Sequence, residues 1–234
     1  MTFGVLLAGS GVYDGSEIHE AVFTLLAIDE AGHSYKCYAP DKDQLHVIDH
    51  TKGEPAEGET RNVLVESARI ARGAIEPLTA ADVETLDGLV IPGGFGAAKN
   101  LNQWAVSGPD GPIDEDVKKL ILAFLKVGKP VAALCMGPTV VAKALEGSDI
   151  HAELTVGTTK EASPYDIGGI SSGMESIGAK TVEKTVREVH VDTTHKIVTA
   201  PCYMMEASVK DIRNNAKQAV DELVKLATGE DVTG

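Results

Sequence analysis

The stretch Pro130-Val131-Ala132-Ala133-Leu134-Cys135-Met136-Gly137 places one cysteine at the end of a short apolar run, with a helical pattern directly after it. Small residues two positions before and after the cysteine permit a strained strand-to-helix turn of the nucleophile-elbow type. The helix predicted over residues 137–145 offers free N–H groups and a positive dipole end, which favour a thiolate. Cys135 is therefore the candidate reactive centre, and the Met136 N–H is the first candidate oxyanion donor.

An isolated cysteine is more often a small buried hydrophobic residue than a nucleophile. That interpretation is preferred for Cys37, which lies in a predicted strand, and for Cys202, which follows Pro201 in a segment expected to be extended. Three cysteines are an odd number without metal-type spacing, so the sequence predicts neither a disulfide framework nor a metal site.

Strands and helices alternate on both sides of the Cys135 turn. Apolar runs predict strands over residues 3–8, 34–39, 88–91, 130–134 and 197–200, and periodic patterns predict helices over residues 14–28, 62–70, 79–84, 113–127, 137–145 and 208–227. This alternation predicts an α/β fold, a mostly parallel sheet covered by helices on both faces, with its site at the carboxyl ends of the strands. No linker divides the chain, so we expect one domain over 1–234, with a lid or hairpin excursion at 41–60.

The chain has 234 residues, 43% of them hydrophobic, and a formal net charge of −14. This charge repels phosphate backbones and anionic lipids, so neither nucleic acid nor a membrane is an expected partner. The apolar runs are too short to span a bilayer, and the start lacks a secretory signal pattern. We expect a cytoplasmic protein, or one of the mitochondrial matrix if the source is a eukaryote.

A glycine-rich loop, Pro92 to Asn100, follows the strand predicted at 88–91. Gly93 and Gly94 can aim N–H groups at an oxyanion. A nucleotide phosphate cradle is weakly supported, because neither G-x-G-x-x-G nor a P-loop lysine is in register. A tight turn without a binding role stays open as an alternative.

Two acidic residues, Glu17 and Glu20, are three positions apart and share one face of the first predicted helix. A buried carboxyl beside a thiol tends to have a raised pKa and can move protons near neutral pH. Alternatively, Glu17 closes a capping box with Asp14 and Glu20 is solvated. No histidine is spaced as a triad partner of Cys135, although His19 and His50 could reach a site.

These three constellations together resemble the DJ-1/PfpI superfamily of the class I glutamine amidotransferase-like fold. Five runs resemble the ElbB group more closely, whose members are known as isoprenoid biosynthesis glyoxalases or enhancing lycopene biosynthesis proteins. The runs are Gly11 to Glu20, Ala39-Pro40-Asp41, His46 to His50, Thr60 to Leu64 and Pro92 to Leu101.

The resemblance implies a flavodoxin-like sandwich, usually a homodimer, whose elbow cysteine matches Cys135 and whose first-helix glutamates match Glu20 and Glu17. It also implies an oxyanion loop at Gly93 and Gly94, and we include Asn100 with Met136 among the expected oxyanion and substrate-binding residues. The implied reaction is a cofactor-free, metal-free, glyoxalase-type conversion of glyoxal or methylglyoxal into a hydroxy acid.

The chain departs from the wider superfamily after the strand expected around residues 154–157, where Thr158 and Thr159 stand in place of a supporting histidine. This departure argues against peptidase or glutaminase activity, which needs a base to protonate a poor leaving group. It also predicts a low glyoxalase rate. Two alternatives stay open: a redox-responsive or interaction protein with an oxidisable Cys135, and a protein deglycase.

Overall fold

A seven-stranded sheet forms the centre of the computed structural model, which describes residues 1–230. The strand order is β10-β11-β7-β6-β1-β2-β5, and all neighbours are parallel except β10 and β11. The strands are β1 Thr2–Leu6, β2 Ser34–Ala39, β5 Ile75–Pro77, β6 Gly88–Ile91, β7 Val131–Leu134, β10 His190–Asp192 and β11 Ile197–Ala200.

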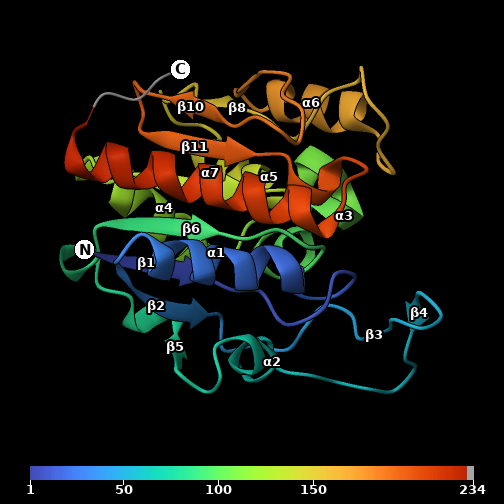
Figure 1. Cartoon of the computed structure of the whole chain (residues 1–234). Helices are drawn as coiled ribbons and strands as arrows, with labels where there is room; N and C mark the ends of the chain where they lie inside the picture. Colours follow the sequence, from blue (N-terminus) through green and yellow to red (C-terminus); the bar gives the residue numbers. More distant parts are fainter. Residues whose placement is uncertain (231–234) are drawn as a thin grey trace.

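Helices cover both faces of this sheet (Figure 1). Helices α1 and α7 pack against each other on one face, and α4 and α5 pack together on the other. The helices are α1 Ile18–Glu30, α2 Val63–Ile70, α3 Trp104–Ser107, α4 Glu115–Lys126, α5 Gly137–Leu145, α6 Ile167–Ser176 and α7 Val209–Thr228. This arrangement confirms the predicted α/β sandwich, a mostly parallel sheet covered by helices on both faces.

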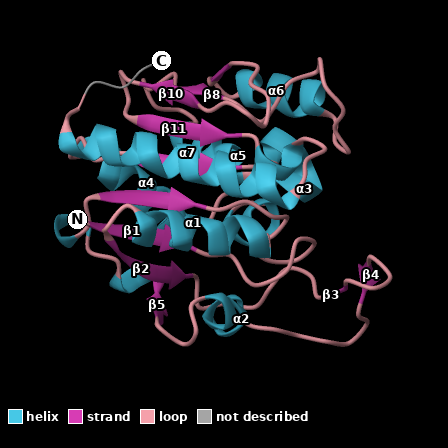
Figure 2. Cartoon of the chain, viewed as in Figure 1, coloured by secondary structure: helices cyan, strands magenta, loops and turns pink. Residues whose placement is uncertain are grey.

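Smaller elements lie in the connections between the main ones (Figure 2). Two short sheets pair β3 Ile48–Asp49 with β4 Glu54–Pro55, and β8 Glu153–Leu154 with β9 Lys180–Thr181. Single helical turns are found at Leu78–Ala80, Val83–Thr85, Ala97–Leu101, Gly108–Asp110 and Cys202–Met204. Within residues 1–230, none of the helices has the length and apolar character needed to cross a membrane.

The central strands form because their residues are apolar without interruption. Every residue of β6, β7 and β11 is buried, as expected for parallel strands covered on both faces. Helix α7 begins at a capping box between Ser208 and Asp211 and ends at Gly229, which has the left-handed conformation at φ 75°. Because β1, β6, β7 and β11 are parallel neighbours, their carboxyl ends lie at one edge of the sheet.

Several sequence predictions need correction. Cys202 is not extended: it begins a 3-10 turn and has φ 46°. The segment predicted as a helix at 79–84 forms two separate 3-10 turns around Ala81. The strand expected around residues 154–157 is the shorter β8, Glu153–Leu154. Strands β5, β9 and β10 and helix α6 are not predicted by the sequence, because their short or Gly- and Ser-rich segments lack a clear apolar period.

The start of α1 also differs from the prediction. Glu17 is itself the N-cap, and its side chain accepts from the Glu20 N–H. Asp14 does not begin a capping box, because its carboxylate accepts from the Ile48 N–H at 2.7 Å and lies 3.7 Å from Nε2 of His50. Asp14 therefore ties the excursion at 41–60, which contains the β3–β4 hairpin, to the loop before α1.

Candidate active site

Cys135 lies on the sharp turn between β7 and α5. Its φ of 56° is in the left-handed region, which is uncommon for a residue with a side chain. Its N–H donates to the Ala200 carbonyl oxygen at 2.9 Å, which continues the β7–β11 ladder into the turn. Gly137 is required here, because a Cβ would lie 2.7 Å from the Ile91 carbonyl oxygen. The chain thus has the nucleophile elbow that the sequence predicts.

Glu20 places its carboxyl group beside the Cys135 thiol, close enough to form a hydrogen bond with it. It is fully buried. Its Oε2 accepts from the Gly93 N–H at 3.0 Å and its Oε1 accepts from the Tyr203 N–H at 3.1 Å. Burial and the nearby charge of Glu17 raise the pKa of Glu20 to about 8. Glu20 is therefore mostly protonated at neutral pH, rather than solvated as in the alternative interpretation.

Glu17 connects Glu20 to the surface. Its Oε2 accepts from the Glu20 N–H at 2.8 Å, and its own N–H donates to the Gly93 carbonyl oxygen at 2.9 Å. Burial raises the pKa of Glu17, although its hydrogen bonds and the nearby His19 oppose the shift. Glu17 therefore acts as a helix cap and also forms part of the site.

The two glycines after β6 have different contacts. The Gly93 N–H is occupied by Glu20, whereas the Gly94 N–H, together with that of Met136, is directed at the Cys135 sulfur. A Cβ at Gly93 would lie 2.3 Å from Cys135 Cβ, and one at Gly94 would lie 2.3 Å from the Glu17 nitrogen. Only glycine allows this close approach of loop, helix and elbow.

The resting charge of Cys135 differs from the sequence prediction. Burial and the negative charge of Glu20 raise the pKa of the thiol well above its ordinary value, and the N–H groups of Gly94 and Met136 oppose this shift without cancelling it. The prediction that the helix terminus favours a thiolate is therefore corrected: the resting group is a neutral thiol, because it shares a dry site with a carboxyl group. A reaction at this sulfur must transfer its proton to a neighbour.

Asn100 was expected among the oxyanion and substrate-binding residues, but its side chain hydrogen-bonds backbone groups of other loops. Its side-chain nitrogen donates to the carbonyl oxygens of Ala8 and Asp14, and its side-chain oxygen accepts from the Leu45 N–H. With these three bonds, Asn100 joins the loop after β6 to the loop after β1 and to the 41–60 excursion. Its observed contacts are therefore those of a positioning residue.

Two side chains that sequence reasoning missed complete the site. Tyr203 follows β11, and its hydroxyl lies 2.8 Å from Nδ1 of His19. Tyr165 lies before α6, and its ring packs edge-on against Phe95 with centroids 5.7 Å apart. Position at the carboxyl edge of β11 could have indicated Tyr203, whereas nothing in the sequence pattern marks Tyr165.

An open cavity of about 450 Å³ lies at this edge of the sheet. It is lined by Val12, Tyr13, Glu17, His19, Pro164, Tyr165, Tyr203, Met205, Glu206 and Ala207. Glu17 belongs both to this wall and to the cluster around Cys135. The cavity thus gives a small molecule a place to bind next to Glu17, although Cys135 and Glu20 do not themselves line its wall.

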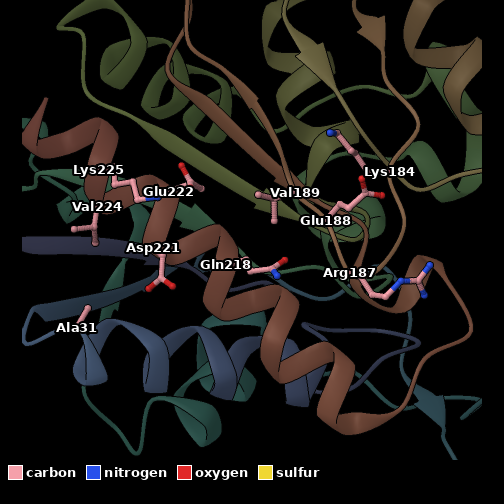
Figure 3. A pocket seen from close by; sticks show the side chains of 10 residues that line it. All are labelled: Ala31, Lys184, Arg187, Glu188, Val189, Gln218, Asp221, Glu222, Val224 and Lys225. Carbon is pink, nitrogen blue, oxygen red and sulfur yellow. Dashed lines mark hydrogen bonds and ion pairs between the residues drawn. The ribbon is translucent and has the colours of Figure 1, made fainter. Parts of the chain in front are cut away.

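A larger cavity of about 560 Å³ lies elsewhere, between the end of α1 and α7 (Figure 3). Its wall includes Ala31, which follows α1, whereas Glu17 precedes this 13-residue helix. At 1.5 Å per residue, the two ends are about 20 Å apart. Several charged groups of its wall are already paired, as in the Lys225–Glu222 contact at 2.6 Å. This cavity is therefore separate from the Cys135 site.

The described residues, 1–230, contain no group of three or more His, Cys, Asp or Glu side chains arranged to hold a metal ion. The region where the superfamily places a supporting histidine contains Thr158, whose N–H contacts the Met205 sulfur, and Thr159, which hydrogen-bonds Glu183. The functional groups available for a reaction at the elbow are thus a thiol, two carboxyl groups and backbone N–H groups.

Comparison with known proteins identifies relatives that match nearly all of this chain, although no family model matches it. Human glutamine amidotransferase-like class 1 domain-containing protein 3, a mitochondrial protein, is 42% identical over 223 residues, which cover 95% of this chain and 82% of the relative. The crystal structure of an isoprenoid biosynthesis protein with an amidotransferase-like domain from Ehrlichia chaffeensis is 33% identical, with a TM-score of 0.87. The match covers 97% of this chain and 99% of that one.

More distant solved structures share the fold. Glyoxalase III from Candida albicans is 15% identical with a TM-score of 0.61, over 95% of this chain and 97% of that one. Drosophila melanogaster DJ-1beta is 16% identical with a TM-score of 0.51, over 97% of this chain and 96% of that one. At these identities the likeness concerns the DJ-1/PfpI fold alone.

Proposed function

The chain belongs to the glutamine amidotransferase-like class 1 domain family, and from this membership and its site we propose that it is a cofactor-independent, glyoxalase-type enzyme that converts small dicarbonyls into hydroxy acids. The observation that carries the proposal is the convergence of the Cys135 thiol, the Glu20 carboxyl group and the Gly94 N–H. These are a nucleophile, a proton carrier and an oxyanion donor in one water-poor site.

The reaction begins with addition of the Cys135 sulfur to the aldehyde carbon. Ionised Glu20 takes the thiol proton as the S–C bond forms, and the N–H groups of Gly94 and Met136 stabilise the developing oxyanion. The oxyanion then receives that proton and becomes the hydroxyl of a hemithioacetal. No ionised thiol is needed before substrate binds, which suits the raised pKa of Cys135.

The second stage moves a proton between the two substrate carbons. A carboxylate removes the proton from the carbon bonded to sulfur, and a proton returns to the neighbouring ketone carbon. The hydroxyl proton of the hemithioacetal passes to the former ketone oxygen, giving a 2-hydroxy thioester. Water then breaks the C–S bond, which releases the hydroxy acid and restores the thiol. One substrate carbon is oxidised and the other reduced, so dicarbonyl and water supply every atom of the product.

Methylglyoxal conversion without glutathione should give lactate as its product. Incubation of the protein with methylglyoxal, without glutathione and with EDTA present, is expected to yield more than one lactate per protein chain, measured by NMR. EDTA removes any contaminating metal-dependent glyoxalase. Loss of methylglyoxal without lactate would mean that the protein only forms adducts, and the proposal would fail.

Stability should depend on pH through Glu20. Its pKa of about 8 lies above its ordinary value of 4.5, so the folded state keeps a proton that the unfolded chain releases. The stabilisation is full below about pH 4.5 and is lost as pH rises through about 8, by on the order of 5 kcal/mol at 1.36 kcal/mol per pKa unit. Urea unfolding at pH 6 and pH 9 is expected to show a larger loss for wild type than for Glu20→Gln. Equal losses would contradict the buried, protonated carboxyl.

The redox-responsive alternative receives less support from this geometry. Redox-sensing cysteines combine a low pKa with solvent access, whereas Cys135 is 5% exposed and its pKa is raised. Glu20 can remove the thiol proton while the sulfur attacks an aldehyde. The geometry therefore supports catalysis better than spontaneous oxidation of the thiol.

Membership of the ElbB group is also proposed. The sequence runs that resemble this group support it, as does the similarity to the Ehrlichia protein, which is described as an isoprenoid biosynthesis protein. A location in the mitochondrial matrix is proposed if the source is a eukaryote, because the human relative is mitochondrial.

The predicted homodimer is supported by the outer face of α1. Ile18, Val22 and Leu26 recur every four residues, and each is at least 40% exposed, so they form one apolar stripe along the helix. We expect wild type to be a dimer by light scattering and Val22→Glu to be a monomer. A monomeric wild type would contradict this proposal.

A further inference from the structure

We propose that the preferred substrate carries a bulky, uncharged apolar or aromatic group, which binds among Tyr13, Tyr165 and Tyr203 beside the elbow. This inference rests on the proposed function, because it names the substrate class of the same site. It differs from the expectation of glyoxal or methylglyoxal as the preferred substrate.

The size of the cavity is the first reason. Methylglyoxal has about five heavy atoms, which occupy on the order of 100 Å³ when each is given somewhat less than the ~30 Å³ of a liquid water molecule. The open cavity next to Glu17 measures about 450 Å³, within the range of pockets that hold much larger ligands. A small dicarbonyl would leave most of its wall without contacts.

The charge of the wall is the second reason. None of its ten residues is Lys or Arg. Lys99 is not part of the wall, and its Nζ donates to the Tyr13 carbonyl oxygen at 2.8 Å. A carboxylate or phosphate on the substrate would therefore meet Glu17 and Glu206 without a Lys or Arg to pair with. The histidine of the wall, His19, already bonds the Tyr203 hydroxyl and lies 4.0 Å from Glu17, so anionic substrates are disfavoured.

A cationic group is also less well matched than an uncharged one. Glu206 is exposed to water at the rim, where an ion pair is worth little. Glu17 uses one carboxylate oxygen on the Glu20 N–H. The remaining surface is formed largely by aromatic rings, Met205, Pro164 and Val12, which favour apolar contacts.

The aromatic wall is held in place by other side chains. Tyr165 packs against Phe95, the Tyr13 ring lies 5.0 Å from the His50 ring, and the Tyr203 hydroxyl is bonded to His19. A wall fixed before binding loses little entropy when a ligand packs on it. The Tyr203 N–H also donates to Glu20, so this residue connects the wall of the cavity to the carboxyl group beside Cys135.

Kinetics with two 2-oxoaldehydes test the inference. We expect wild type to convert phenylglyoxal to mandelate with a kcat/KM about 10-fold above that for conversion of methylglyoxal to lactate. Tyr165→Ala should lower this ratio about 10-fold, whereas Tyr35→Ala, which removes an exposed tyrosine of β2 outside the site, should leave it unchanged. A wild-type ratio of one or less, or equal ratios in all three proteins, would overturn the inference while the proposed function stands.

Binding of unreactive ketones keeps the inference testable if neither aldehyde is turned over, an outcome that would count against the proposed function. Acetophenone, 4-acetylbenzoate and acetone share the carbonyl but differ in size and charge. Calorimetric titration of wild type should give at least 10-fold tighter binding of acetophenone than of the other two. Equal affinities, or tighter binding of the carboxylate, would refute an uncharged apolar site independently of catalysis.

Discussion

Cys135→Ala is expected to lower kcat/KM for dicarbonyl conversion at least about 10³-fold, to the level of the uncatalysed background. The sulfur forms the only covalent bond to substrate in the proposed reaction, and no other group of the elbow can replace it. The substitution keeps a Cβ, so the left-handed backbone at φ 56° is as strained as before. Lactate formation and the melting temperature, measured together, separate loss of chemistry from loss of folding.

Cys37→Ala is the matched control. Cys37 is also buried, but it lies in β2, and its thiol pKa is raised to about 11 by burial. Its removal costs packing without touching the elbow, so turnover should stay within about twofold of wild type. Equal activity of wild type and Cys135→Ala would end the covalent mechanism.

Glu20→Gln is expected to lower kcat/KM by about 10²- to 10⁴-fold, the usual contribution of a positioned acid or base. The amide keeps the shape of the carboxyl group, but its single oxygen can accept from only one of the Gly93 and Tyr203 N–H groups, and it cannot take the thiol proton. The wild-type rate should rise with pH through about 8, because the ionised form of Glu20 is the base. The variant should lose this step in its pH profile.

Glu66→Gln is the control for this variant. Glu66 is a buried carboxylate in the first turn of α2, paired with Arg69 at 2.8 Å and outside the elbow. We expect Glu66→Gln to lower the free energy of unfolding modestly. Its rate of dicarbonyl conversion should still rise with pH through about 8. If Glu20→Gln keeps both the rate and the step, Glu20 is not the proton carrier, and Glu17→Gln becomes the variant to compare.

Local pattern was enough to predict several elements of the fold, among them two that flank this site. Strand β2, helix α5 and strand β11 have the bounds that the sequence indicates, because uninterrupted apolar runs and regular helical periods determine them. The brief strands β8 and β9 and the Gly- and Ser-rich helix α6 carry no comparable period, and their existence depends on packing against the rest of the fold.

The sequence predicted which residues form the site better than it predicted what they contact. Gly93 and Gly94 are adjacent in the chain, yet one N–H bonds Glu20 and the other is directed at the Cys135 sulfur. Asn100 connects backbone groups of two other loops. Such differences arise from segments far apart in the sequence, whose relative placement no local pattern contains.

The sequence by itself determined that the chain alternates strands and helices, that Cys135 ends a buried strand before a helix, and that two glutamates share a helical face. Those features depend on hydrophobic period and on the small residues that a sharp turn requires. Only the tertiary structure decided the charge of the site. Burial of Glu20 against Cys135 makes the resting thiol neutral, because desolvation by surrounding elements outweighs the local helix terminus. Only the tertiary structure, likewise, brought Tyr13, Tyr165 and Tyr203 from three separate loops into one wall.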